Sequence, residues 1–339
     1  MAEEINVSIK KLIVHILDNN LHLPVLSDEE HPEDEEIDEF VEKHIIKILK
    51  DDSVKKARFT DENSRMKEIC ESLVLSYADF KPYTDEAAGI LFEIMQKHVD
   101  IPSADVIFTI FEVDNEPYFG ILKFNYKSSY IHYVHTRQTG KVNTIVKQKT
   151  ALPTEGQRLD ECVLISLHSL EISLLEKKYE INGEKDFYLS TLFLKCSGDL
   201  STREKVKIFK KANENFNKQF FNEDFTKSAE LKTAVAESFD QNAAIHVVEV
   251  AETVFRQNPE MKNTYIDYME KAGITGGTLE VSETVAERKF KRQKIKTDTG
   301  IEINLPVEYY KDSDKMEFIN NVDGTISILI KNVSKIVDA

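Results

Sequence analysis

The segment DVIFTIFEVDNEPYFGILKFNY, residues 105–126, decides the fold class expected for this chain. On either side of the turn residues Asp114–Pro117, apolar side chains follow the period of two that is typical of β-strands. Asp, Asn and Pro are residues that favour tight turns. The segment therefore predicts two antiparallel strands that open a β-meander.

The strand pattern continues for some seventy residues beyond this turn. The dipeptide Asn182-Gly183 is typical of a two-residue hairpin turn. The strands expected after the turn are 118–126, 129–136, 142–148, 161–168, 171–180 and 186–194.

Helical and strand patterns alternate in blocks around this middle region. Residues 5–17 read as one or two strands, and helices are expected from Pro32, over Asp61–Ala78 with Thr60 as N-cap, and after a cap at Thr84. A capping box at Ser201 and Glu204 opens a helical segment. Its further helices are expected at 226–240, 242–256 and 260–271, and final strands at 288–296, 299–304, 316–320 and 325–331.

Separate blocks of helix and strand favour an α+β fold over a doubly wound parallel sheet. The expected order is an N-terminal strand and helices, an antiparallel β-meander, a helical segment and C-terminal β-hairpins. We expect an α+β lobe with a central antiparallel sheet over 1–198, and a helical segment followed by a C-terminal β lobe over 199–339.

The composition is that of a folded protein of the cytoplasm. Three widely spaced cysteines, without any C-x-x-C pair, indicate neither a disulfide framework nor a zinc site. No apolar run reaches the length of a membrane span, and the N-terminus opens with acids instead of a basic signal region. We therefore expect a cytoplasmic protein without membrane contact.

Charge is distributed very unevenly along the chain. The formal net charge is −16, with 60 acidic against 44 basic residues, yet the stretch between Pro117 and Thr154 contains no Asp or Glu. Tyrosines and phenylalanines alternate there with cations, a combination that suits phosphate contact and base stacking. The cations of this acid-free segment are Lys123, Lys127, Arg137, Lys141, Lys147 and Lys149.

Two later segments are also basic. The helix at 203–218 places cations on its outer side, and the run at 288–296 has six cations and no acid. The alternative interpretation is a solvated helix face and an edge strand that lysines protect from aggregation. The candidate phosphate contacts here are Lys207, Lys210, Lys211, Arg288, Lys289, Lys291, Arg292, Lys294 and Lys296.

One enzymatic pattern is present. Asp160, followed by Glu176 and Lys178 on the next expected strand, has the acid and E-x-K layout by which some nucleases hold Mg²⁺. A cross-strand ion pair on an exposed sheet explains the same residues. His132 and His135 lie three apart on one expected strand and so face opposite ways, which argues against a shared metal. We predict no catalytic residue, metal or cofactor.

Two stretches resemble the bacterial nucleoid-associated protein family known as NdpA. The first is Phe193-Leu194-Lys195-Cys196-Ser197-Gly198, which leads into the capped helix, and the second is the tail from Thr299 to Ile328 with its Met316-Glu317-Phe318-Ile319-Asn320-Asn321 core. The order of elements agrees over nearly the whole chain. The resemblance implies association with the bacterial chromosome and supplies no catalytic residue.

These observations favour a nucleoid-associated protein that binds DNA, preferentially double-stranded, with little sequence specificity and without catalysis. A second hypothesis is an interaction module whose acidic N-terminal region, −10 over residues 1–40, docks on a chromosomal protein. A Mg²⁺-dependent nuclease is the third. Oligomer formation is compatible with all three.

Overall fold

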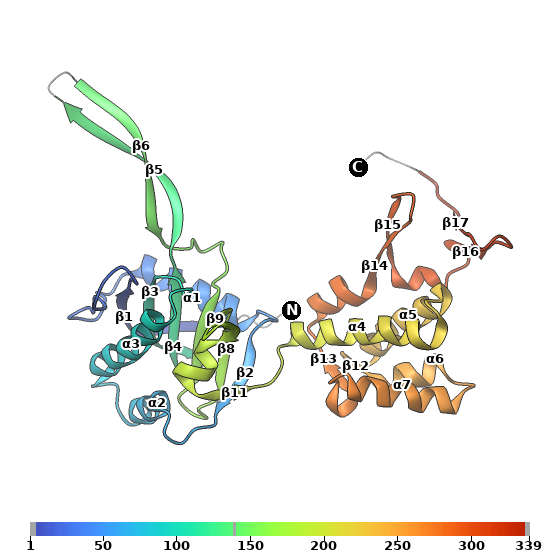
Figure 1. Cartoon of the computed structure of the whole chain (residues 1–339), viewed down its shortest axis with the longest axis horizontal. Helices are drawn as coiled ribbons and strands as arrows, with labels where there is room; N and C mark the ends of the chain where they lie inside the picture. The colour runs from blue at the N-terminus through green and yellow to red at the C-terminus, as the bar shows by residue number, and fades with distance from the viewer. Residues whose placement is uncertain (1–4, 138–139, 336–339) are drawn as a thin grey trace. The chain divides into compact units, whose positions relative to one another are not determined.

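The protein forms two compact units, Met1–Ser201 and Thr202–Ala339. The structure is a computed structural model that describes residues 5–137 and 140–335, without the side chains of Arg137 and Asn320 (Figure 1). The division that we expected after residue 198 falls after Ser201. Antiparallel sheets and helices occupy separate blocks of the chain, which confirms the α+β class.

Unit 1 is built on a seven-stranded sheet of order β1-β3-β4-β7-β8-β2-β11, all of whose neighbours pair antiparallel. Its strands are β1 (Val7–Leu17), β2 (Lys55–Phe59), β3 (Ala104–Val113), β4 (Glu116–Asn125), β7 (Glu161–Ser166), β8 (Ile172–Leu175) and β11 (Cys196–Gly198). Two ribbons lie outside this sheet: β5 (Lys127–Arg137) with β6 (Gly140–Ala151), and β9 (Lys178–Ile181) with β10 (Glu184–Phe187).

The quoted segment forms the middle of the sheet, as its sequence predicted. β3 and β4 pair from Ala104↔Asn125 to Val113↔Glu116. Asp114 and Asn115 form the turn with φ of 51° and 71°, the left-handed backbone that Asp and Asn tolerate. Burial of both faces of β3 and β4 explains why their apolar residues run almost without interruption.

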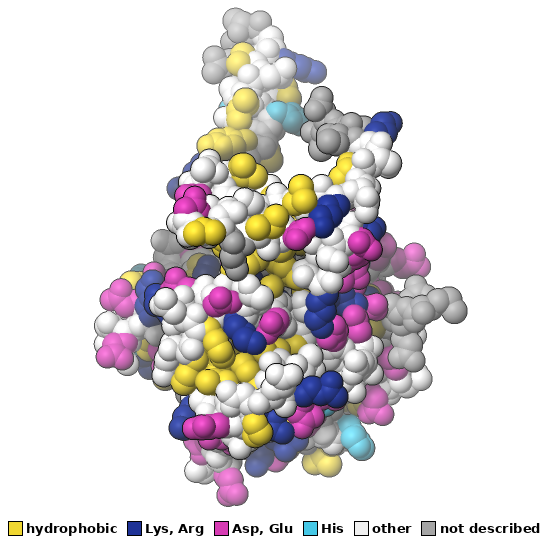
Figure 2. All heavy atoms as spheres, turned by 90° about the vertical axis from the view of Figure 1, so that its right-hand side faces the viewer, with side chains coloured by type: hydrophobic (Ala, Val, Ile, Leu, Met, Phe, Trp, Pro, Cys, Tyr) yellow, Lys and Arg dark blue, Asp and Glu magenta, His cyan; other side chains and the backbone are white. Residues whose placement is uncertain are grey.

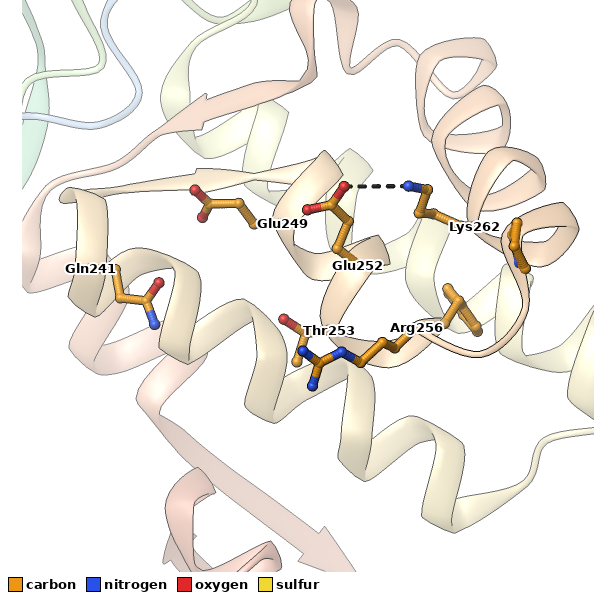
Figure 3. A pocket seen from close by; sticks show the side chains of 8 residues that line it. Gln241, Glu249, Glu252, Thr253, Arg256 and Lys262 are labelled. Carbon is orange, nitrogen blue, oxygen red and sulfur yellow. Dashed lines mark hydrogen bonds and ion pairs between the residues drawn. The ribbon is translucent and has the colours of Figure 1, made fainter.

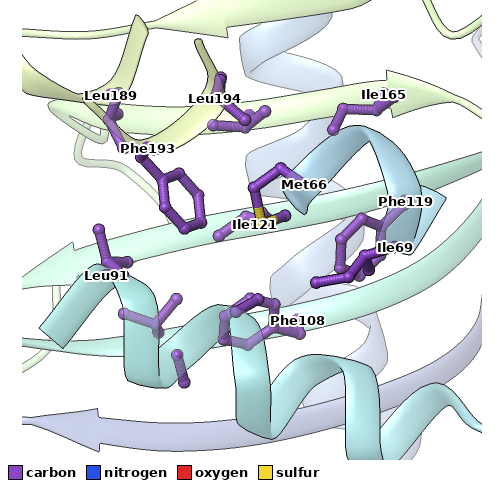
Figure 4. Packing of buried hydrophobic residues seen from close by; sticks show 14 of the residues in the cluster. Met66, Ile69, Leu91, Phe108, Phe119, Ile121, Ile165, Leu189, Phe193 and Leu194 are labelled. Atoms are coloured by element: carbon purple, nitrogen blue, oxygen red, sulfur yellow. The ribbon is translucent and has the colours of Figure 1, made fainter. Parts of the chain in front are cut away.

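Helices cover both faces of the sheet. The helices are α1 (Glu35–Leu49), α2 (Arg65–Leu75), α3 (Phe80–Lys97) and the π-helix η1 (Leu189–Leu194). α2, α3 and η1 pack on one face, where Met66, Leu91 and Phe193 belong to the same buried cluster as the sheet residues Phe108 and Phe119 (Figure 4). α1 packs through Val41 and Ile45 in a second cluster with Phe111 and Phe124 of the opposite face.

β1 is one continuous strand and contains a bulge. The register with β3 shifts between Ile9 and Lys11. A bulge moves the following side chains to the other face. It therefore explains why the apolar positions change from odd numbers before residue 10 to even numbers after it.

Two helix starts in unit 1 differ from the prediction. α2 begins at Arg65 with Ser64 as N-cap, and not at Thr60, because Thr60 follows the unpredicted strand β2 and its amide donates to the Lys195 carbonyl. α3 begins at Phe80, one turn before Thr84, because Pro82 lies in the first turn, where proline is tolerated. Thr84 is an interior residue whose hydroxyl donates to the Lys81 carbonyl.

The strand expected at 186–194 is also wrong. β10 ends at Phe187 and the chain continues as η1, whose Leu189, Phe193 and Leu194 are buried against the sheet. The expected strand 171–180 is divided into β8 and β9. The Asn182-Gly183 hairpin is confirmed, with Ile181 paired to Glu184.

Unit 2 is a helical core with short hairpins. Its helices are α4 (Thr202–Phe221), α5 (Phe225–Asn242), α6 (Val247–Val254), α7 (Pro259–Lys271), α8 (Glu283–Ala286), the π-helix η3 (Glu287–Lys291) and the 3-10 turns η2 (Thr275–Gly277) and η4 (Val307–Tyr310). Its strands are β12 (Ala244–His246), β13 (Thr278–Glu280), β14 (Arg292–Lys296), β15 (Glu302–Pro306), β16 (Met316–Asn320) and β17 (Ile326–Ile330). None of the helices in the described ranges of the two units has the length and apolarity needed to cross a membrane.

The basic run at 288–296 was predicted as one strand and is only partly one. Arg288–Lys291 belong to η3, because Phe290 is buried against Phe209 of α4 and fixes this turn on the helical core. Only Arg292–Lys296 form a strand, which pairs with β15. The hairpin of β16 and β17 across residues 321–324 agrees with the prediction.

Candidate nucleic-acid interface

The acid-free segment forms a long two-stranded arm. β5 and β6 leave the sheet of unit 1 and pair only with each other, from Lys127↔Ala151 at the root to Arg137↔Gly140 at the far end (Figure 1). Successive side chains of a strand point to opposite faces. The arm therefore presents two faces to solvent, and their compositions differ.

One face, here called the cationic face, carries lysines. Lys141 and Lys147 lie opposite Thr136 and Tyr130, and Lys149 follows on β6 where the register with β5 shifts between Gln148 and Ala151. All three lysines are exposed, and none forms an ion pair within the described residues. Tyr130 lies opposite Lys147 with 72% of its surface accessible, so its ring is exposed for stacking.

The opposite face, here called the apolar face, carries different residues. Its cross-strand pairs are Ile131↔Val146, Tyr133↔Thr144 and His135↔Val142. Tyr133 and His135 touch edge to face with ring centroids 4.7 Å apart. His132 and His135 lie on different faces, so the arm does not bring them together as metal ligands.

Two further cations of the segment lie at the ends of the arm. Lys127 is partly exposed at the root, next to a register shift between residues 127 and 129. Arg137 ends β5, and its side chain lies outside the described residues.

Lys123 is not available to a ligand, which corrects its assignment as a phosphate contact. Only 2% of its surface is accessible, and its Nζ lies 2.9 Å from Glu161 Oε2 and 2.5 Å from Asn125 Oδ1. Tyr179 donates to the same carboxylate oxygen at 3.0 Å. Burial lowers the pKa of Lys123, while Glu161 opposes that shift. This lysine holds the sheet together where the chain enters the arm.

Unit 2 brings the other two basic segments together. Lys207 and Lys211 of α4 are exposed, and the half-buried Lys210 lies over the Phe290 ring at 5.3 Å. Burial, and then the charges of Lys289 and Lys232, lower the pKa of Lys210. Lys210, Lys232 and Lys289 thus form a lysine cluster, without an ion pair in the described part of unit 2.

Lys232 is a member that the sequence did not reveal. It lies on α5, outside the basic segments, and burial lowers its pKa. The only available signal was its position at the boundary of an apolar helix face, directly after Leu231 and one turn before Val235.

Two cations of the 288–296 run, Lys291 and Lys294, are already neutralised by acidic side chains. Lys291 contacts Asp240 at 2.7 Å and Glu287 at 2.9 Å, and Lys294 contacts Glu302 at 2.6 Å. Arg288, Arg292 and Lys296 are exposed without such partners in the described residues. The face of unit 2 seen in Figure 2 likewise mixes cations with acidic and apolar side chains.

A cavity of unit 2 adds no excess positive charge. Arg256 and Lys262 line it together with Glu249 and Glu252, and Lys262 pairs with Glu252 at 3.3 Å (Figure 3). Glu249 accepts hydrogen bonds from Ser238 and Asn242. The charges of this cavity balance one another.

The nuclease-like residues do not form a metal site. Glu176 is buried, accepts from the Ser190 amide and lies 3.4 Å from Lys55, while Lys178 lies over the Phe187 ring. Asp160 lies 3.9 Å from Lys177. Across residues 5–137 and 140–335, no three His, Cys, Asp or Glu side chains are grouped to hold a metal ion.

The acids near the N-terminus have structural tasks. Asp34 caps α1 by accepting from the Glu36 and Ile37 amides, and Glu35, Glu36 and Asp38 lie in the first turn. Carboxylates there stabilise the positive end of the helix dipole.

Cationic surfaces set apart from an acidic remainder are typical of proteins that associate with a polyanion. The family model described as nucleoid-associated protein YejK matches residues 13–337. The chain belongs to this bacterial nucleoid-associated family, which confirms the resemblance seen in its sequence and locates the protein at the chromosome in the cytoplasm. No curated protein matches the chain.

Proposed function

We propose that this nucleoid-associated protein binds double-stranded DNA along the phosphate backbone, with little sequence preference and without catalysis. The cationic face of the β5–β6 arm makes the principal contact. The observation that carries the proposal is the set of three exposed lysines without ion pairs, Lys141, Lys147 and Lys149, on one strand of an arm without described acids.

The length of the arm explains how so acidic a protein approaches DNA. Unit 1 has 37 Asp and Glu against 23 Lys and Arg, so its body repels phosphate. The 11 residues of β5 extend about 35 Å from root to end at ~3.3 Å per residue. That reach is several times the screening length of ~8 Å at physiological salt. The far end of the arm is therefore largely screened from the acidic body.

The shape of the arm suits a duplex. A two-stranded β-ribbon fits the ~12 Å wide major groove. Lys141 and Lys149 are eight residues apart on one strand, which corresponds to about 27 Å, most of a ~34 Å helical turn. The described cationic face carries His132, Thr136 and Asn143 beside its lysines and Tyr130. The proposal assigns the lysines to the phosphate backbone, whose contacts carry no direct sequence information.

The lysine cluster of unit 2 is a secondary contact in this proposal. The charges of Lys289 and Lys232 oppose that of Lys210 more strongly than the nearby Glu214 supports it, so a phosphate would relieve this repulsion. Lys207 and Lys211 extend the same helix surface. Together with the arm, about six phosphates are neutralised, which corresponds to a slope near −5 for log K against log salt.

The test measures duplex DNA affinity across salt concentrations for the wild type and for Lys141→Gln/Lys147→Gln/Lys149→Gln. The variant should bind more weakly at low salt, and its salt slope should become shallower by about 2.7, because three phosphate contacts are lost. A wild type that does not bind duplex DNA at low salt, or a variant with an unchanged slope, would refute the proposal.

A matched control changes net charge by the same amount elsewhere. Lys218, Lys311 and Lys331 each lie in a surface ion pair, with Glu223, Glu237 and Glu317. Their triple replacement by Gln should leave affinity and salt slope close to those of the wild type. The comparison separates a located contact from a general effect of net charge.

Indirect association through a chromosomal protein is a distinct outcome. Glu33, Glu35 and Glu36 are exposed at the start of α1 and can be changed to Gln while the Asp34 cap is retained. If these changes release the protein from the chromosome and the arm changes do not, the acidic region is the docking site.

A further inference from the structure

The lysine cluster of unit 2 brings together side chains from three elements. Lys210 lies on α4, Lys232 on α5 and Lys289 on η3. Lys210 and Lys232 are half-buried, whereas Lys289 is exposed. None of the three forms an ion pair within the described part of unit 2. The cluster therefore holds amines that the fold has partly removed from water without giving them a carboxylate partner.

The surroundings of Lys210 favour its neutral amine. Its Nζ lies over the Phe290 ring, 5.3 Å from the centroid. Burial first, and then the charges of Lys289 and Lys232, lower the pKa of Lys210, while Glu214 opposes that shift. Desolvation and a neighbouring cation are the two conditions that turn a lysine into a nucleophile, because the neutral amine carries a free electron pair.

Accessibility distinguishes Lys210 from the buried lysine of unit 1. Burial also lowers the pKa of Lys123. Only 2% of the Lys123 surface is accessible, however, and its Nζ donates to Glu161 and Asn125. A reagent in solution can reach Lys210 but not Lys123.

The neighbouring cations suit a reagent that carries a phosphate beside its electrophilic carbon. An ammonium group binds phosphate as a point charge, and Lys289 is exposed for this contact. In an acyl phosphate, the phosphate is attached directly to the reactive carbonyl group. A phosphate held by Lys289 thus brings that carbonyl close to the Lys210 amine, and such positioning accelerates a reaction between two partners.

We propose that Lys210 is a site of acylation by acyl phosphates, and that Lys289 and Lys232 bind the phosphate of the reagent. The neutral amine nitrogen attacks the carbonyl carbon and forms a C–N bond. The bond between that carbon and the phosphate oxygen breaks, and inorganic phosphate leaves with the electron pair and takes up the proton that the nitrogen releases. The product is an uncharged amide, so the reaction removes one positive charge from unit 2.

Acylation would make the charge of unit 2 depend on the supply of acyl phosphate. An amide cannot neutralise a DNA phosphate. If unit 2 contacts DNA as proposed above, the salt slope of the modified protein should become shallower by about 0.9. This consequence rests on the proposed function, whereas the modification itself does not.

The measurement uses the full-length protein without DNA, acetyl phosphate as the reagent, and mass spectrometry of peptides to follow each lysine. Lys211, the next residue of α4, is exposed and serves as the internal reference. Acetylation of Lys210 should be at least about threefold faster than that of Lys211. Inorganic phosphate, added as a competitor, should slow acetylation of Lys210 and leave that of Lys211 unchanged.

Adjacent residues of η3 provide a matched pair of variants. Lys289→Gln removes a cation that binds the reagent and opposes protonation of Lys210, so acetylation of Lys210 should slow at least about twofold. Arg288→Gln removes the same charge one residue away, at an exposed residue that does not act on the Lys210 amine. It should leave the rate at Lys210 unchanged. Circular dichroism verifies that both variants fold.

Three outcomes overturn the proposal. Equal rates at Lys210 and Lys211 in the wild type mean that the cluster does not activate Lys210. Equal effects of the two variants contradict the role of Lys289. A rate at Lys210 that inorganic phosphate does not change contradicts binding of the reagent by the cluster.

Discussion

Burial changes the role that the sequence suggested for Lys123. In the sequence it is the first cation of an acid-free segment, but in the fold it contacts Glu161, Asn125 and the Pro102 carbonyl. Glu161 follows the arm in sequence, and Lys123 precedes it. The ion pair therefore joins the two places where the chain leaves and re-enters the sheet.

Replacing Lys123 with Met should lower the free energy of unfolding by about 3–5 kcal/mol, because Glu161 would be left buried without its charge partner. Urea denaturation measures the change. Lys149→Met, on the exposed arm, is the control and should unfold like the wild type. The folded Lys123→Met protein should bind DNA with wild-type affinity. Reduced affinity would mean that Lys123 contributes to the DNA interface.

His44 makes stability depend on pH. It is buried between Phe40 and Phe124, whose ring centroids lie 4.7 and 5.1 Å away, and burial lowers its pKa from 6.5 to about 4. Between these two values the unfolded chain binds a proton that the folded protein does not. Stability from this residue is therefore complete above pH 6.5 and decreases as the pH falls toward 4.

The variant His44→Phe removes this titration and retains an aromatic ring. Relative to the variant, the wild type should lose up to about 3 kcal/mol of unfolding free energy between pH 7 and pH 4. Denaturation curves of the two proteins over this range test the expectation. A difference that does not change with pH would contradict it.

At the scale of secondary-structure elements, the β5–β6 arm contributes least to the stability of unit 1. β5 and β6 form a sheet of their own, and the root is closed by β4 pairing with β7, including Lys123 with Glu161. Replacing residues 128–150 with an Asn-Gly turn should change the unfolding free energy of unit 1 by less than about 1 kcal/mol. Calorimetry tests this expectation, and DNA binding should be severely weakened in the same variant.

Hydrogen exchange gives a second measure of the same element in the intact protein. Amides of β5 and β6 should exchange much faster than those of β3 and β4, because the arm lacks a buried face. Equal protection in dilute protein would mean that the arm is as stable as the sheet, contrary to this account. A large loss of unfolding free energy on arm replacement would lead to the same conclusion.

Elements with a strong local signal were predictable, whereas elements defined by their partners were not. β3, β4 and the turn between them follow from apolar alternation and the left-handed preference of Asp and Asn. β2, Lys55–Phe59, has few apolar residues and is a strand because β8 and β11 flank it. η1 reads as a strand locally and is helical because three of its side chains pack under the sheet.

At the scale of the whole molecule, acidic and basic side chains are segregated in the fold as well as along the sequence. Unit 1 carries most of the net negative charge, and its arm presents Lys141, Lys147 and Lys149 on a segment without acids. The α4 and 288–296 segments meet in unit 2, so two of the three basic segments share a unit. The third is presented separately by the arm.

The sequence by itself determined the α+β class, the acid-free segment, the final hairpins and membership of a nucleoid-associated family, because each rests on local periodicity, composition or residue order. Only the tertiary structure decided which lysines face solvent. It buried Lys123 beside Glu161, neutralised Lys291 and Lys294, and added Lys232 to a cluster. The physical reason is that exposure and pairing of a charge depend on residues far away in the chain, whose positions local sequence does not encode.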